Sequence, residues 1–162
     1  MADKLAATFH GASLTDTLRP ILAAYRAEVQ PHWSAATAHP DYEGAAGSPV
    51  GQCGVTSAWL QRRLAEDHGV EAHYTLGILR NASNYGVEHV WLDLGAWPDS
   101  LVLDLTADQD PKFGLTSVVC TGYSDLFREG ADYIPERYLS LAETLRNPVR
   151  ERLTILTEAV GR

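Results

Sequence analysis

Gly51-Gln52-Cys53-Gly54-Val55-Thr56-Ser57-Ala58-Trp59-Leu60 is the stretch around which the fold is organised. Small and apolar residues share one helical face as far as Leu64, and Gly69 is a suitable C-terminal stop. The pattern predicts a helix over residues 53–67, with Cys53 in its first turn. A helix N-terminus favours thiolate over thiol, so this cysteine is a candidate nucleophile.

Three strand candidates follow this helix. Residues 72–79 and 87–94 flank a turn-like segment at 81–84, and the turn at 97–100 leads into residues 101–106. A helix followed by short strands joined by tight turns is typical of an antiparallel meander. The sequence therefore predicts the α+β class, with the cysteine-bearing helix packed on an antiparallel sheet.

Two candidate partners for the cysteine lie on neighbouring strands. Because side chains alternate along a strand, His89, Trp91 and Asp93 share one face, and Asp104 can meet His89 across the strand pair. If the Cys53 helix packs on that face, thiol, imidazole and carboxylate converge. The alternative is an unrelated buried cysteine, half-exposed histidine and strand-end aspartate, but their joint occurrence favours a cysteine-nucleophile enzyme.

The rest of the chain gives weaker signals. Apolar spacing predicts a helix over 14–29 that begins close to Pro20, and residues 30–49 form a long loop. Further helices are expected at 124–129, at 136–146, and from Asn147-Pro148 to about Val160.

Composition excludes several classes of protein. The 162 residues fit a single domain, 1–162, with a catalytic core at about 49–109, and the net charge is -8 with no dense basic run. Nucleic acid and anionic membrane are therefore not expected as partners. Neither a signal peptide nor a membrane span is expected, which favours a cytoplasmic protein whose cysteines, Cys53 and Cys120, stay reduced.

These segments also match a family pattern. A helix-starting Gly-x-Cys, a His-x-Trp strand, and an aspartate followed by threonine on the next strand resemble the transglutaminase-like and papain-like cysteine enzymes. The chain is more closely similar to the small bacterial YunG-like proteins, which carry similar segments to Gly51–Thr56 and Asp104–Gln109. The resemblance covers about residues 49–109.

The resemblance implies a thiol triad with Cys53 as nucleophile, His89 as acid and base, and Asp104 as the group that orients His89. Asp93 is four residues along the same strand and too far away for direct contact with His89. Asp108 is better suited to a supporting or substrate-contacting role.

The oxyanion and substrate-binding groups are less determined. Backbone amides at the start of the helix, including that of Gly54, point to where negative charge would develop. Gln52 is either a side-chain donor to the oxyanion or an amide that braces the loop. Trp33 either covers the site or belongs to the core, and Gln109 joins Asp108 as a substrate-binding candidate.

We therefore expect a cysteine-dependent acyl-transfer enzyme that acts on an amide, ester or thioester, without a metal or other cofactor. The substrate is expected to be a small molecule or peptide, and the residues leave open whether the acceptor is water or an amine. The oligomeric state is also left open. The alternative is a non-catalytic binding module that retains the transglutaminase-like fold.

Overall fold

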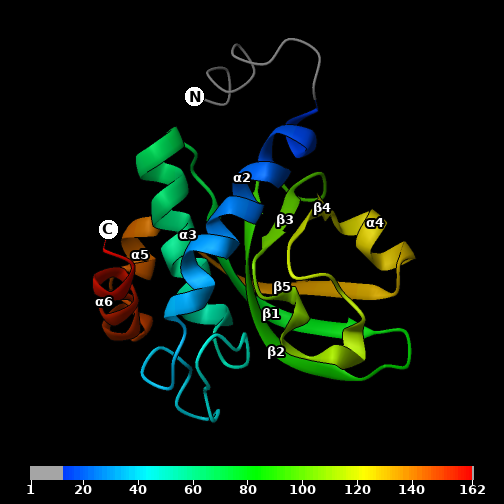
Figure 1. Cartoon of the computed structure of the whole chain (residues 1–162). Coiled ribbons are helices and arrows are strands. Elements are labelled where there is room, and N and C mark those ends of the chain that lie inside the picture. The colour runs from blue at the N-terminus through cyan, green and yellow to red at the C-terminus, as the bar shows by residue number, and fades with distance from the viewer. Residues whose placement is uncertain (1–12, 162) are drawn as a thin grey trace.

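A five-stranded antiparallel sheet separates two groups of helices in the computed structural model, which describes residues 13–161 (Figure 1). The strands are β1 (His73–Asn81), β2 (Gly86–Leu94), β3 (Leu101–Asp104), β4 (Val119–Gly122) and β5 (Ala131–Leu139), in the spatial order β4-β3-β2-β1-β5. The α-helices are α2 (Leu14–Val29), α3 (Cys53–His68), α4 (Tyr123–Arg128), α5 (Leu141–Thr144) and α6 (Val149–Val160). Short 3-10 helices are η1 (Gln30–His32), η2 (Ala107–Gln109) and η3 (Pro111–Phe113).

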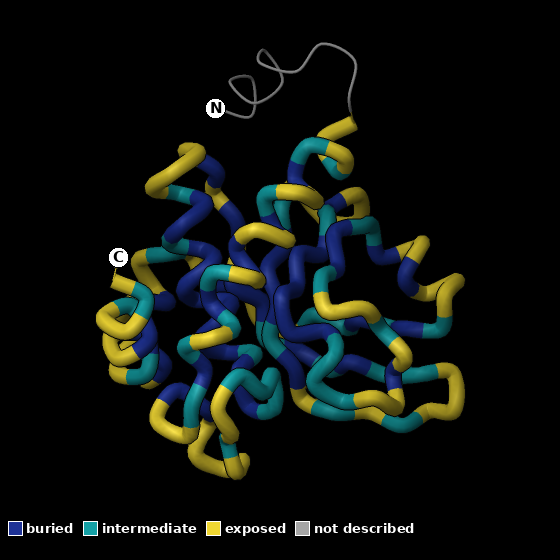
Figure 2. Tube along the Cα trace, in the orientation of Figure 1, coloured by how far each residue is buried: buried dark blue, intermediate teal, exposed yellow. Residues whose placement is uncertain are grey.

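Two apolar cores lie on opposite faces of this sheet. The core beneath α2, α3 and α6 includes Trp59, Leu92 and Leu103. The core on the face covered by α4, η2 and η3 includes Trp91 and Leu126. Figure 2 shows the buried residues concentrated along the strands and the inner helix faces, with the exposed ones at the outer turns. The alternation expected for β2 is confirmed, because Trp91 and Leu92 belong to different cores.

The helices before the sheet agree closely with the pattern of the sequence. α3 begins at Cys53, and the chain turns away at Gly69, whose φ is 63°. α2 covers the expected residues, but the expectation that it begins near Pro20 is wrong. Ser13 caps it instead, by accepting a hydrogen bond from the Asp16 amide at 3.1 Å, and the exposed Pro20 lies inside the helix.

The α+β class and the antiparallel meander β1-β2-β3 are confirmed. Strands β4 and β5 were not expected, and the expected helix over 136–146 is wrong, because residues 136–139 complete β5 beside β1. A helix starts only after Ser140, where Ser140 and Glu143 form a capping box for α5. This pair is visible in the sequence and marks where the helix begins.

The helices after β4 match the expectations within a few residues. α4 covers most of the segment expected at 124–129. α6 begins at Val149, whose amide donates to Asn147 Oδ1 at 3.2 Å, and it ends at Val160 as expected.

Candidate active site

His89 and Asp104 form a buried pair where β2 and β3 meet. The Nε2 atom of His89 lies 2.6 Å from Oδ2 of Asp104, and neither side chain has exposed surface (0% each). The strand register pairs Leu92 with Leu103, so Asp104 follows the last paired residues and reaches His89 diagonally. The structure thus brings together the two groups that the strand pattern placed on one face.

Three further donors hold the carboxylate of Asp104. Its Oδ1 accepts hydrogen bonds from the amide of Thr106 at 2.7 Å and from the hydroxyl of Thr106 at 3.0 Å. The hydroxyl of Tyr133 on β5 donates to Oδ2 at 2.9 Å. Burial alone would raise the pKa of Asp104, but the charge and hydrogen bonds of His89, and then those of Thr106 and Tyr133, lower it. Asp104 therefore remains ionised and keeps the proton of His89 on Nε2.

α3 does not cover the face that carries His89. It packs on the opposite face of the sheet, where Val90 and Leu92 point toward it. The expectation that the cysteine helix would lie over His89 and Trp91 is therefore wrong. The sequence shows which residues share a strand face, but both faces of β2 are apolar enough to bury, so the pattern could not tell which one the helix covers.

Cys53 lies close enough to His89 to influence the pKa of the imidazole, beyond the paired part of β2 and β3. The described pairing of these strands ends at Leu92, and the carbonyl oxygen of Val90 accepts a hydrogen bond from Ser57 Oγ of α3 at 3.2 Å. The first turn of α3 thus lies beside this part of β2. Complete burial alone would lower the pKa of His89, but the charge and hydrogen bond of Asp104, followed by those of Cys53, raise it to about 10.

Gln109 lies at the other ring nitrogen of His89. Its Nε2 is 3.0 Å from His89 Nδ1, while its Oε1 is buried with no hydrogen-bond partner among residues 13–161. An imidazolium carries a proton on Nδ1 and can only donate there. Because the pKa of His89 is raised to about 10, the protonated ring requires the Gln109 amide to present Oε1 to Nδ1 instead. Gln109, expected to contact substrate, is placed on the histidine.

The first turn of α3 has free backbone donors but no help from Gln52. No side chain caps this helix. The side chain of Gln52 is fully buried; its Nε2 donates to the Ser34 carbonyl oxygen at 2.9 Å and its Oε1 accepts from Thr37 at 2.9 Å. The geometry favours the loop-bracing alternative for Gln52 over a donor to the oxyanion. The amides of Cys53 and Gly54 remain the donors at the helix start.

Two other substrate-binding candidates, Trp33 and Asp108, are engaged by the fold itself. Trp33 is 1% exposed and belongs to the helix-side core, with the Arg26 guanidinium 4.5 Å from its ring centre. Trp33 therefore does not cover the site. Asp108 accepts hydrogen bonds from Arg26 at 2.8 and 3.0 Å, so its carboxylate is engaged by α2 rather than turned toward a substrate.

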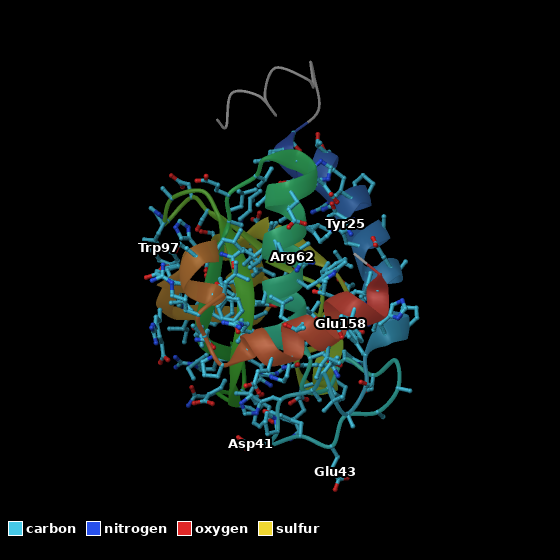
Figure 3. The ribbon with its side chains drawn as sticks, turned by 90° about the vertical axis from the view of Figure 1, so that its left-hand side faces the viewer. Tyr25, Asp41, Glu43, Arg62, Trp97 and Glu158 are labelled. Carbon is cyan, nitrogen blue, oxygen red and sulfur yellow. The ribbon has the colours of Figure 1, made fainter. Side chains whose placement is uncertain are left out.

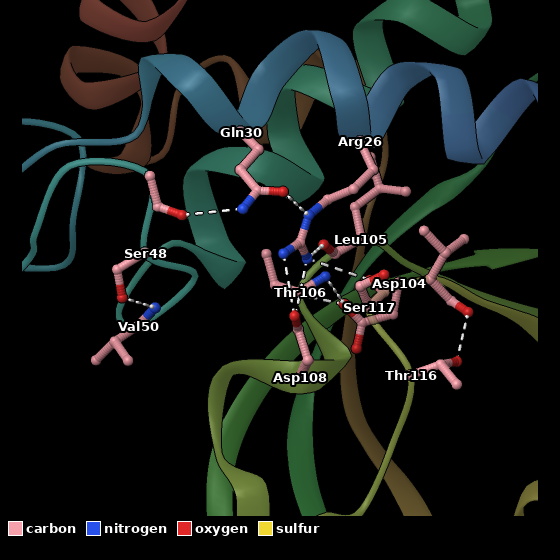
Figure 4. Close-up of polar contacts among 12 residues, drawn as sticks. Arg26, Gln30, Ser48, Val50, Asp104, Leu105, Thr106, Asp108, Thr116 and Ser117 are labelled. Atoms are coloured by element: carbon pink, nitrogen blue, oxygen red, sulfur yellow. Dashed lines mark hydrogen bonds and ion pairs between the residues drawn. The ribbon is translucent and has the colours of Figure 1, made fainter.

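Arg26 connects three segments around the site (Figure 4). Besides Asp108, its guanidinium contacts the carbonyl oxygens of Leu105 and Ser117. Its Nε donates to Gln30 Oε1 at 3.0 Å, and Gln30 in turn donates to the Gly47 carbonyl oxygen at 3.2 Å. This network holds the segment after β3, which carries Gln109, against α2 and the long loop.

Asp93, the rejected alternative to Asp104, lies in a separate network. Its carboxylate accepts hydrogen bonds from the hydroxyl of Tyr123 at 2.6 and 2.7 Å and from that of Thr75 at 2.8 Å. Burial raises the pKa of Asp93. The argument from strand length against direct contact between Asp93 and His89 agrees with this placement.

Three residues near the site went unnoticed in the sequence. Tyr133, which supports Asp104, lies on the unexpected strand β5. Tyr74 on β1 and Arg152 on α6 lie beside Gly54. No sequence motif marks these residues, because each comes from a segment distant from Cys53 and is brought in by tertiary packing.

Comparison with protein-family models, with curated proteins and with solved structures gave no match. Within residues 13–161, no group of three or more His, Cys, Asp or Glu side chains is arranged to hold a metal ion. In the same part of the chain, no helix has the length and apolar character needed to cross a membrane.

Proposed function

We propose that this chain is a cysteine-dependent acyl-transfer enzyme that uses Cys53, His89 and Asp104. The observation that carries the proposal is the placement of His89, which bonds Asp104 through Nε2 and lies beside Cys53 on a helix N-terminus. Nucleophilic thiol catalysis requires a thiol, an imidazole beside it and a carboxylate that holds the imidazole. Here the thiol is partly exposed, and the imidazole and the carboxylate are buried.

The geometry supports a two-stage reaction. The thiolate of Cys53 attacks a carbonyl carbon, a C–S bond forms, and the amides of Cys53 and Gly54 stabilise the oxyanion. His89 donates its Nδ1 proton to the departing amine, alcohol or thiol, and the acyl-enzyme remains. Water or an amine then gives its proton to Nδ1 as it attacks, and the C–S bond breaks to release the product and restore the thiolate.

The transglutaminase-like or papain-like core is part of the same proposal. A cysteine at a helix N-terminus, followed along the chain by antiparallel strands that carry histidine and aspartate, supports the resemblance to these enzymes and to the YunG-like proteins. The substrate is then a small or peptidic amide, ester or thioester. Water as acceptor gives a hydrolase, and an amine as acceptor gives a transamidase.

A binding module that keeps this fold is the second candidate. It is favoured by the complete burial of the His89 side chain, which a purely structural pair with Asp104 would also show. Thiol reactivity separates the two candidates, because only catalysis needs a thiolate at neutral pH.

Alkylation with iodoacetamide at neutral pH tests the proposal. We expect Cys53 to react at least about tenfold faster than Cys120, because Cys53 lies at a helix N-terminus beside His89. Cys120 is the internal control: it is 4% exposed, and burial raises its thiol pKa to about 11. Equally slow labelling of both cysteines would falsify the catalytic proposal and favour the binding module.

Trapping an acyl adduct identifies the chemistry. Incubation with a panel of amides, esters and thioesters, followed by mass spectrometry, should give a mass increase on the peptide that contains Cys53. The adduct should persist in Cys120→Ser and vanish in Cys53→Ala. Fast alkylation of Cys53 without any acyl adduct would indicate a thiol enzyme of different chemistry.

A further inference from the structure

Two polar side chains from different elements converge beside the residue that follows the nucleophile. A Cβ atom built on Gly54 would lie 3.1 Å from the hydroxyl of Tyr74 on β1 and 3.7 Å from Nη2 of Arg152 on α6. Figure 3 shows α6, which carries Glu158, crossing α3, which carries Arg62, and the two helices are in contact. Because Gly54 has no side chain, no atom at this position of α3 comes between the helix backbone and these two groups.

The hydroxyl of Tyr74 is a donor without a protein partner, at the end of an otherwise buried side chain. Tyr74 is 3% exposed, and its hydroxyl makes no hydrogen bond within the described part of the chain. Burial and then the negative charge of Cys53 raise its pKa well above the ordinary value, although Arg152 acts in the opposite direction. The hydroxyl therefore stays protonated and can donate at neutral pH.

The guanidinium of Arg152 also lacks a partner. Its Nη1 is buried without a hydrogen bond, and no carboxylate of residues 13–161 forms an ion pair with it. Nearly all buried donors in proteins are paired, and an unpaired donor of a charged group costs free energy. A cation held in this way next to a neutral donor is suited to a ligand with negative charge.

We propose that Tyr74 and Arg152 form a subsite for a carboxylate group of the substrate, next to the carbonyl that Cys53 attacks. This inference rests on the function proposed above and narrows the substrate to acyl donors that carry a carboxylate near the scissile bond. A planar guanidinium with a neighbouring hydroxyl matches the oxygens of a carboxylate. The local cation is needed because the chain as a whole has a net charge of -8 and repels anions at long range.

The experiment compares two alkylating reagents that differ in charge. Iodoacetate and iodoacetamide have similar size and react with the same thiolate, so the ratio of their rates at Cys53 reports attraction of the carboxylate. We expect Arg152→Gln to slow iodoacetate by about threefold to tenfold, as expected for loss of one charge several ångströms away. The rate with iodoacetamide should change by less than about twofold over the same comparison.

Matched variants make the comparison specific. Arg150→Gln removes the same charge from an exposed position of α6 and should leave the ratio of rates unchanged. Tyr74→Phe removes a hydroxyl that holds nothing else in the fold, so it should lower the ratio without unfolding the protein. If Arg152→Gln fails to fold, the ratio of iodoacetate to iodoacetamide rates in Tyr74→Phe tests the subsite.

The outcomes separate the two proposals. If Arg152→Gln slows both reagents equally, or if neither variant changes the ratio, the subsite is wrong while the thiolate of Cys53 stands. If Cys53 reacts no faster than Cys120 with either reagent in the unmodified protein, the proposed function fails first, and the subsite inferred from it falls too.

Discussion

At the scale of single residues, the protonation of His89 depends on few contacts. Asp104 fixes Nε2 and Gln109 lies at Nδ1, so the ring cannot rotate without losing two hydrogen bonds. In the proposed reaction, the nitrogen that exchanges protons with substrate is the one that Gln109 contacts. We therefore expect Gln109 to position His89 rather than to contact substrate.

Replacing Gln109 by methionine tests this role. We expect Gln109→Met to lower the pKa of His89, because the Gln109 oxygen accepts the Nδ1 proton of the imidazolium and a hydrogen bond to a charged group is worth about 1.5–3 kcal/mol. The pKa is measured by following the His89 ring nitrogens by NMR as a function of pH. Gln30→Met, in a glutamine that contacts Arg26 and Gly47, is the control and should leave the pKa unchanged. A rise of the pKa in Gln109→Met would show that the amide donates to neutral imidazole instead.

At the scale of elements, the central strand β1 needs a glycine where it runs between β2 and β5 beside the site. Gly77 pairs with His89 on one side and with Pro135 on the other, next to a register shift. A Cβ atom there would lie 2.1 Å from the Ile134 carbonyl oxygen and 2.6 Å from Trp91, whose ring stacks on His89 with centres 6.2 Å apart. The absence of a side chain thus allows Trp91 to lie flat beneath the imidazole.

Gly77→Ala should therefore destabilise the fold by about 1–3 kcal/mol or more, the range for overpacking a buried site, because a backbone carbonyl cannot move away as a side chain can. Urea unfolding measures the change. Gly122→Ala is the matched control, since a Cβ atom on that strand residue meets nothing within 4 Å. Equal stability of the two variants would contradict the close packing described for Gly77.

At this scale the sequence was informative where local patterns decide the structure. The bounds of α3 follow from Gly69 and the helical spacing, and the pairing of His89 with Asp104 follows from strand alternation. The strand β5 was missed because Glu136 and Arg137 are exposed on it and have ordinary helix propensity. No local pattern shows which face of the sheet α3 covers, because tertiary packing decides it. The same packing brings in Tyr133, Tyr74 and Arg152.

At the scale of the whole molecule, the buried ion pair links stability to pH. The pKa of His89 is raised from 6.5 to about 10 on folding, mainly by Asp104 and then Cys53, although burial acts to lower it. A raised pKa stabilises the folded state fully below the unfolded value, and this contribution is lost as the pH rises through the folded value. The lowered pKa of Asp104 acts in the opposite range, with stability lost as the pH falls below about 4.

We therefore expect the free energy of unfolding to fall between about pH 6.5 and 8, with a slope of up to about 1.4 kcal/mol per pH unit for one proton. Urea denaturation at several pH values measures this slope. Buried tyrosines release protons from the unfolded chain only at higher pH, whereas Cys120 begins to do so above about pH 8, so the slope is measured below that pH. His89→Gln should flatten the curve, and an unchanged slope in that variant would assign the pH dependence to other groups.

The division of the interior into two cores has a consequence for the evolution of this chain. Cys53 begins α3, which packs on one core, whereas the ring of His89 lies beside Trp91 of the other core. Substitutions at Leu60 and Leu126, one in each core, are therefore expected to add independently in stability. The proposed alignment of the Cys53 thiol with the His89 imidazole depends on both cores, because α3 packs on one and His89 contacts Trp91 and Tyr133 of the other. Two substitutions that act independently on stability can therefore depend on each other in their effect on the proposed thiol chemistry.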